Sequence, residues 1–272
     1  MPSSGWVRRD LDVEIISKMY LEEKMSAQEI AKAMGTSSQT IGRLLEDIKI
    51  RKRNIREANL ASWAKREYPG VEISERQEQI IVGTLLGDGH LGVQVSSRNP
   101  TFSVGHREVD KEYTLWKYSE LESTNLFRNP PFPREKTLNR KIFRRWGIRS
   151  IQHPILKTYF DLIYQDHRKT LTLETLEKCG ALGVAIYYMD DGGLYSRKYP
   201  CFYTYGYRED EILLLRYFLS KRWDLHFELK KVDYGRPKKK GHILIIEKES
   251  IGRFRELIVP HIIPCMSRKI PP

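Results

Sequence analysis

Two segments of this chain share one pattern, an apolar run that ends abruptly in Asp-Gly. The first is IIVGTLLGDGHL, beginning at Ile80, and the second is LGVAIYYMDDGGLY, beginning at Leu182. Each run predicts a helix that is apolar nearly all round and is therefore buried. A chain with two such helices must bury both of them, and we expect each to pack against the other.

The segments that follow these two runs are duplicated as well. Each half continues with an alternating stretch that predicts a hairpin, then a helix, a second hairpin rich in basic residues, and a closing helix. A lysine follows each closing helix: Lys169 comes 81 positions after Asp88, and Lys269 comes 78 positions after Asp191. The sequence therefore predicts a pseudo-twofold α+β core of two αββαββα repeats, at about residues 71–170 and 171–272.

The duplicated Asp-Gly ends also predict a chemistry. Gly83 and Gly87 lie one turn apart and allow a partner helix to approach the backbone closely, which places Asp88 near Asp191. A carboxylate at a helix C-terminus opposes the helix dipole, and a second carboxylate adds repulsion, each costing up to about 1 kcal/mol. Carboxylate oxygens suit Mg²⁺, and a divalent cation would offset that cost. Taken singly, each Asp-Gly is better explained as a helix stop with an exposed Asp; the duplication strongly favours the metal site.

The N-terminal part predicts a separate helical domain. Residues 12–48 have the spacing of three short helices, with Ser26 and Glu29 forming a capping box, Gly35 in a left-handed turn, and Thr36 or Ser37 capping the third helix. We expect residues 1–50 to form this domain and residues 51–70, which are basic and end in Pro69-Gly70, to form a linker to the core at residues 71–272.

The segment MSAQEIAKAMGTSSQTIGRLL resembles the helix-turn-helix of bacterial resolvases, regulators and sigma factors. The resemblance implies that the third helix lies in the major groove of DNA and presents side chains near its start to the base edges. The alternative is a helical unit that only packs on the rest of the chain. The candidate base contacts are Ser37, Ser38, Gln39 and Arg43.

Composition favours a polyanionic partner. Lys and Arg total 47 against 35 Asp and Glu, which gives a formal charge of +12 and a pI near 9.5. Nucleic acid is the leading candidate, although a basic surface also serves solubility. The chain has no apolar run of roughly 18 residues, so we expect a soluble cytoplasmic or otherwise intracellular protein, with a nucleoid or organelle location open. Its three cysteines are far apart and predict neither a disulfide framework nor a zinc site.

The two motifs also resemble a known family, the LAGLIDADG homing endonucleases, in their single-chain form with two motifs. IVGTLLGDG and VAIYYMDDG lie on the nine-residue family motif, with Asp88 and Asp191 at its acidic position, and the pattern departs at Ile186, where the motif has glycine. The similarity extends from Glu72 to the C-terminus, including LTLETLEKCGALGVAIYYMDDGG and VPHIIPCMSRKIP. The resemblance implies a monomer whose two sheets form a saddle over the DNA.

The resemblance further implies a site-specific endonuclease that cuts both strands of a long DNA target with Mg²⁺, for which Ca²⁺ or Mn²⁺ are substitutes. The implied catalytic residues are Asp88, Asp191, Lys169 and Lys269. Asp88 and Asp191 are the implied metal ligands, with Gly87 and Asp190 as further candidates. Contacts to DNA are expected from the strands and hairpin tips, at Gln94, Ser96, Arg98, Arg140, Lys141, Tyr195, Arg197, Lys198, Tyr203, Tyr205, Arg236, Lys238, Lys239 and Lys240.

Two other functions fit the same sequence. A catalytically weak or inactive protein of this fold could serve as a DNA-binding regulator or as an intron-splicing maturase, and the N-terminal helices suit such a role. A transcription factor whose C-terminal part senses a ligand or dimerises is a weaker third, because it leaves the duplicated carboxylates unexplained. The seven histidines show no nuclease spacing, and we interpret them as structural or surface residues.

Overall fold

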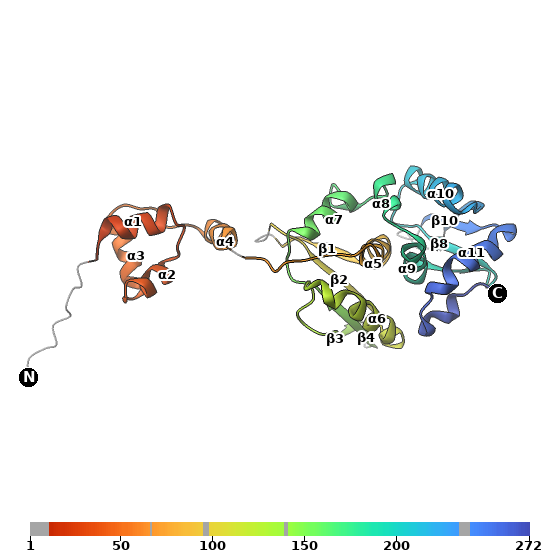
Figure 1. The fold of residues 1–272 in the computed structure, drawn as a ribbon, viewed down its shortest axis with the longest axis horizontal. Helices are drawn as coiled ribbons and strands as arrows, with labels where there is room; N and C mark the ends of the chain where they lie inside the picture. The colour runs from red at the N-terminus through yellow and green to blue at the C-terminus, as the bar shows by residue number, and fades with distance from the viewer. Residues whose placement is uncertain (1–10, 66, 95–97, 139–140, 234–239) are drawn as a thin grey trace, which may run out of the picture. The chain divides into compact units, whose positions relative to one another are not determined.

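The computed structural model describes residues 11–65, 67–94, 98–138, 141–233 and 240–272 (Figure 1). The chain divides into two compact units, of which the larger begins at Pro69. Among the described residues, no helix has the length and apolar character that crossing a bilayer requires. The helices of the smaller unit are α1 (Val13–Leu21), α2 (Ala27–Ala33), α3 (Ser38–Asp47) and α4 (Ile55–Ala64).

The caps of the smaller unit are those expected from its sequence. Ser26 accepts a hydrogen bond from the Glu29 amide at 3.2 Å, and its own amide donates to Glu29 at 2.6 Å, which completes the capping box. Gly35 has φ of 62°, the left-handed conformation predicted for it. Ser37 caps α3 by accepting from the Thr40 amide. The three helices enclose a small core of Ile16, Tyr20, Ile30, Ala31, Ile41 and Leu45.

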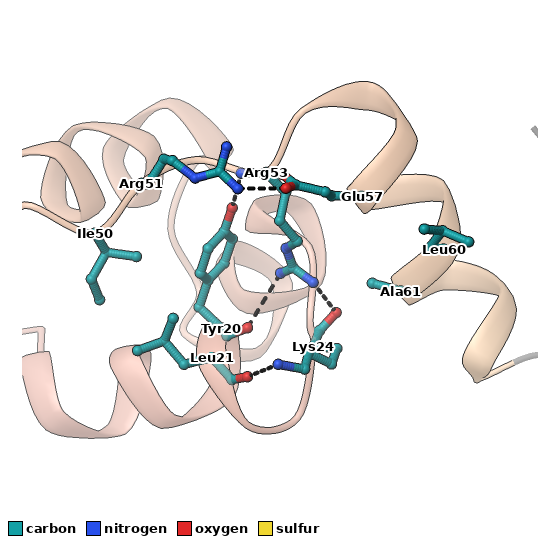
Figure 2. Close-up of a pocket in the computed structure, with 9 residues that line it drawn as sticks. All are labelled: Tyr20, Leu21, Lys24, Ile50, Arg51, Arg53, Glu57, Leu60 and Ala61. Carbon is teal, nitrogen blue, oxygen red and sulfur yellow. Dashed lines mark hydrogen bonds and ion pairs between the residues drawn. The ribbon is translucent and has the colours of Figure 1, made fainter.

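The segment expected as a linker contains α4 and is fastened to α1 through Arg53 (Figure 2). The Arg53 amide donates to the Tyr20 hydroxyl at 2.8 Å, and its guanidinium donates to the Lys24 carbonyl oxygen at 2.8 Å. Arg51 pairs with Glu57 at the start of α4. Between α1 and α4 these residues and Leu60 border a cavity of about 580 Å³. These bonds order the basic segment that follows the three-helix core.

The larger unit contains two four-stranded antiparallel sheets with the same topology, in the order β1-β2-β4-β3 and β7-β8-β10-β9. The first repeat contains α5 (Glu75–Leu86), β1 (His90–Gly92), β2 (Thr101–Arg107), α6 (Lys111–Leu121), β3 (Phe132–Leu138), β4 (Lys141–Arg149), α7 (Ile155–Ile163), β5 (Tyr164–Gln165) and β6 (Arg168–Lys169). After α8 (Leu173–Glu177), the second contains α9 (Ala181–Asp191), β7 (Gly192–Tyr195), β8 (Tyr199–Tyr203), α10 (Glu209–Trp223), β9 (Phe227–Asp233), β10 (Lys240–Ile246) and α11 (Ile251–Ile258). Short 3-10 segments lie at Glu108–Asp110, Glu122–Thr124, Lys248–Ser250, Val259–His261 and Pro264–Lys269.

The order of elements confirms the predicted duplication. Both repeats read helix, hairpin, helix, hairpin, helix, and the α+β class is correct. The hairpin of β7 and β8 closes with Ser196 and Arg197 at φ of 50° and 62°, as a tight hairpin turn requires. One apolar core runs through both repeats and surrounds α5 and α9.

Helices α5 and α9 pack side by side at the centre of the larger unit (Figure 1). A Cβ atom added at Gly83 would lie 2.4 Å from the Gly183 carbonyl oxygen and 2.9 Å from its Cα atom, so the two backbones touch. The second helix thus supplies its close contact from Gly183, three residues before Ile186, the position that departs from the family motif. A Cβ atom at Gly87 would similarly collide with the Cβ atom of Asp190, at 2.4 Å.

Replacing Gly83 by alanine should separate these helices. We expect Gly83→Ala to lower the free energy of unfolding by roughly 2 kcal/mol, because the added methyl group meets backbone that cannot move aside. Urea unfolding followed by circular dichroism measures the change. Gly252→Ala on α11 is the matched control, since nothing lies within 4 Å of its Cβ position, and helix propensity predicts equal or higher stability. Equal stability of the two variants would contradict the close packing.

Candidate active site

The ends of α5 and α9 bring the two predicted motif aspartates to one place. Helix α5 ends at Leu86 with Gly87 as its cap, and α9 ends at Asp191 with Gly192 as its cap. The Asp88 amide donates to an Asp190 carboxylate oxygen at 3.4 Å, across the junction between the repeats. Three carboxylates, those of Asp88, Asp190 and Asp191, therefore gather where two helix dipoles point their negative ends.

Asp191 lies in an environment that disfavours the charged form of its side chain. Burial, followed by the charges of Asp88 and Asp190, raises the pKa of Asp191 to about 7. Among the described residues, no basic side chain forms an ion pair with it. Its carboxylate is thus costly to ionise without a further positive charge.

Asp88 lies in a different environment. Burial alone would raise its pKa, but the neighbouring His106, with Lys117 and Arg145, lowers the pKa of Asp88 below its ordinary value. His106 Nδ1 lies 3.4 Å from Asp88 Oδ2. The two motif carboxylates are therefore electrostatically unequal, although the fold that holds them is nearly symmetric.

The Asp190 side chain forms a buried ion pair. Lys117 Nζ on α6 donates to both Asp190 oxygens at 2.9 Å, and both side chains have no exposed surface. Burial lowers the pKa of Lys117, while the Asp190 carboxylate opposes that shift. Because both oxygens bond to the ammonium group, the Asp190 side chain is less suited to a cation than that of Asp191.

The two predicted lysines reach equivalent positions. Lys169 Nζ donates to the Gly87 carbonyl oxygen at 2.7 Å. Lys269 Nζ donates to the Met189 carbonyl oxygen and also lies within hydrogen-bond distance of the carbonyl oxygens of Asp190, at 3.2 Å, and Tyr188, at 3.5 Å. In both repeats, the acceptors include the residue before the motif aspartate. Burial lowers the pKa of each lysine, and the site's three aspartates oppose the shift. Each ammonium group offsets the negative end of its own motif helix.

A cavity of about 450 Å³ opens from Asp88 along the face of the first sheet that turns away from the helices. Its floor includes Gly105 and Gly147, which are paired across β2 and β4 and carry no side chain. Arg134 and Arg145 line the walls and are exposed. The cavity therefore joins a carboxylate to guanidinium groups beside bare backbone, which suits an approaching phosphate chain.

The structure locates only part of the predicted DNA contacts. Ser37, Ser38, Gln39 and Arg43 are near the start of α3, and Gln94, Arg98, Arg197 and Lys198 are exposed. Tyr195, Tyr203 and Tyr205 pack around Cys201 and Ile243, on the opposite face of β8 from Phe202 in the main core. Ser96, Arg140, Arg236, Lys238 and Lys239 lie outside the described residues, as do the side chains of Lys141 and Lys240.

The sequence did not reveal four residues of this site. Lys117 and His106 reach it from α6 and β2, and His90 and Arg145 line the cavity beside Asp88. Each resembles an ordinary surface residue in the sequence. His90 follows Asp88 by two positions, whereas the other three are brought to the motif only by the pairing of β2 with β4 and the docking of α6. The one available signal was Lys117, a lysine on the otherwise core-facing side of the helix in residues 109–122.

The side chains present fit a divalent cation. The described residues include a cluster that could hold a metal ion, in which one ligand atom each of Asp88, His106 and Asp190 lies within 4.8 Å of the others. Asp191, next to Asp190, has no ion pair among the described residues, and hard oxygen ligands are those that Mg²⁺, Mn²⁺ and Ca²⁺ prefer. The neighbouring carbonyl oxygens of Gly87 and Asp190 add oxygen donors at the same helix ends.

This fold and site define a class: a single-chain enzyme core of two repeats with one acidic residue of each at the joint. Comparison with known proteins places the chain within that class. Residues 78–254 match the LAGLIDADG DNA endonuclease family. The chain belongs to this family and is a homing DNA endonuclease of the LAGLIDADG type.

Individual relatives are distant. The chain is 24% identical to the DNA endonuclease I-ChuI of Chlamydomonas applanata, over 74% of this chain and 96% of that protein. It is 28% identical to the RecA protein of Mycobacterium gastri, over 74% of this chain and 48% of that protein, and so spans about half its length. The structure of the homing endonuclease I-WcaI bound to its DNA recognition sequence superimposes with a TM-score of 0.66 at 20% identity, covering 82% of this chain and 96% of that one.

Neutralising Asp191 should stabilise the metal-free protein. Its pKa is about 7 in the folded state against an ordinary value of 3.8, so the folded protein binds the extra proton between these values and loses stability as pH rises through them. We expect Asp191→Asn to raise the free energy of unfolding at pH 7.5 in EDTA by roughly 2 kcal/mol, and to change it little near pH 4. Urea unfolding across this pH range measures both.

The adjacent residue provides the matched control. Asp190→Asn leaves the buried Lys117 without its partner and should lower stability by roughly 3–5 kcal/mol at neutral pH. Both substitutions remove one negative charge, so the opposite changes in the free energy of unfolding result from the different environments of the two carboxylates. Destabilisation by Asp191→Asn, or a neutral effect of Asp190→Asn, would show that the roles of the two aspartates are assigned wrongly.

Proposed function

We propose that this chain cuts both strands of a specific DNA duplex by hydrolysing one phosphodiester bond in each, with divalent cations held by Asp88 and Asp191. The observation that supports this most directly is the approach of Asp88 to the end of α9, where its amide donates to the Asp190 carboxylate and its charge helps to raise the pKa of Asp191. In each repeat a lysine bonds to a carbonyl oxygen at the same helix end. Mg²⁺ is the proposed physiological ion, with Mn²⁺ or Ca²⁺ as substitutes.

The chain's own residues supply distinct parts of this chemistry. Asp88 and Asp191 are the proposed ligands, one serving each strand, and the Gly87 and Asp190 carbonyl oxygens are further candidates. The Asp190 side chain instead anchors α6 to α9 through Lys117. A bound divalent cation activates water and neutralises developing charge. Lys169 and Lys269, each fixed on a carbonyl oxygen, are placed to orient the attacking water at their own half-site.

DNA is proposed to lie along the open faces of the two sheets. The cavity beside Asp88, with its glycine floor and exposed Arg134 and Arg145, supports this for the first repeat. Arg197 and Lys198, at the turn between β7 and β8, would contact phosphates in the second repeat. The known duplex complex of the similar I-WcaI is consistent with this interface.

The N-terminal helices are proposed to form a helix-turn-helix that extends the recognised DNA. Helices α2 and α3 are joined by a short turn containing the left-handed Gly35, and Gln39 and Arg43 lie in the first turns of α3. Such a unit contacts base edges through the start of its second helix. The basic segment around α4 would add contacts to phosphates.

The endonuclease activity is testable with a randomised duplex library and sequencing of the ends produced. We expect defined double-strand breaks that require Mg²⁺, and Asp88→Asn should slow cutting at least about a hundredfold, since loss of a cation's charge costs several kcal/mol in the transition state. Lys248→Ala, a surface change away from the site, is the control. Sequence-specific binding without breaks would instead support the regulator or maturase function.

The helix-turn-helix has its own test. In the full-length chain, Gln39→Ala with Arg43→Ala should weaken binding to the selected duplex by roughly 1–3 kcal/mol and relax specificity at one end of the target, leaving the cut position unchanged. Footprinting and a titration at fixed salt measure this. Lys32→Ala on α2 is the comparison. An unchanged footprint and affinity would remove the N-terminal unit from DNA recognition.

A further inference from the structure

His106 on β2 is buried between two carboxylates at the first repeat's half of the site. Its Nδ1 atom lies 3.4 Å from Asp88 Oδ2, and its Nε2 atom lies 3.9 Å from Asp190 Oδ1. Only 6% of the side chain is exposed. The imidazole thus connects the solvent-facing Asp88 to the fully buried pair of Asp190 and Lys117.

The position of this ring is fixed by packing. Its centroid lies 4.7 Å from that of the Tyr113 ring, which is itself fully buried and stacked on Trp116. The Nε2 atom is buried and has no hydrogen-bond partner among the described residues, although the imidazole carries two polar atoms. A buried polar group in that state costs stability, which indicates that the residue serves the site and not the packing alone.

The second repeat has no equivalent imidazole among its described residues. In the first repeat, His90 follows the motif aspartate by two positions and pairs with Ser103. In the second repeat, Gly193 follows the motif aspartate by two positions and pairs with Cys201. The residue three positions beyond each partner is His106 in the first repeat and Thr204 in the second. Thr204 is fully buried and donates its hydroxyl to the His242 carbonyl oxygen at 2.7 Å, so it is turned to its own sheet.

We propose that His106 is a positioning residue that holds Asp88, through Nδ1, in the orientation that binds the first cation, and that Asp191 lacks such support. Groups that orient a metal ligand are worth about 10–100-fold in metal affinity. The proposal rests on the proposed function, because it assumes that Asp88 holds a cation. It predicts that the two half-sites differ in metal affinity because of one residue.

The first test measures metal binding without any cleavage. Mn²⁺ is titrated into the protein, and electron paramagnetic resonance measures the free Mn²⁺. We expect His106→Phe to lower the Mn²⁺ affinity of the Asp88-dependent site by about 10–100-fold. His106→Asn places an amide near the Nδ1 position and should recover most of the loss, whereas His106→Gln, which reaches toward the Nε2 position, should not. Asp88→Asn defines the Asp88-dependent part.

Controls separate positioning from packing. His226→Asn removes another imidazole that faces a carboxylate, that of Asp224, at an exposed position, and should leave the titration unchanged. The thermal midpoint of each variant is measured alongside. A Phe variant with a lowered midpoint but normal Mn²⁺ binding, or equal binding by the Asn and Phe variants, would overturn the proposal.

The second test resolves the two DNA strands. On a duplex labelled separately on each strand, His106→Phe should slow the strand that Asp88→Asn slows most, at limiting Mg²⁺, and excess Mg²⁺ should reduce the defect. Equal slowing of both strands would overturn the proposal and leave the endonuclease function standing. Absence of Mn²⁺ binding and of cutting in the wild-type protein would instead overturn the proposed function, and this inference with it.

Discussion

Direct contact between the backbones of α5 and α9 is the constraint on which the rest of this structure depends. Gly83 against Gly183 leaves no room for side chains between the two helices, and Gly87 against Asp190 continues the contact to their ends. Two sheets and the flanking helices then enclose this pair in one core. Because the helices end together, the motif carboxylates are forced into a site that neither repeat could form alone.

That concentration of negative charge is offset in two ways. Inside the protein, Lys117 neutralises Asp190, and Lys169 and Lys269 bond to carbonyl oxygens at the helix ends. These three ammonium groups cover the buried carboxylate and the dipoles, and they show that a cation is not the sole compensation for charge at the joint. The carboxylate of Asp191 has no ion-pair partner among the described residues, and its pKa is raised to about 7. Asp88 faces the open cavity.

Local patterns in the sequence predicted much of this. Apolar runs, capping residues and the duplicated order of elements indicated both repeats, the N-terminal helices and the motif aspartates, because each is a property of adjacent residues. The spacing of Lys169 and Lys269 also led to their place beside the helix ends. His106 and Lys117 were missed since their role arises from strand pairing and helix docking between distant segments, which no periodicity encodes. The sequence alone does not distinguish the role of Asp190 from that of the adjacent Asp191. The buried ion pair between Asp190 and Lys117 in the structure makes this distinction.

The central claim is that Asp88 and Asp191 together hold divalent cations at the joint of the repeats. Anomalous diffraction at the manganese absorption edge, from crystals of the protein with its selected duplex and Mn²⁺, tests this most directly. The account predicts peaks within coordination distance of both carboxylates and none at the carboxylate of Asp190. Peaks confined to Asp190, or an ordered duplex with neither aspartate near a metal, would contradict it.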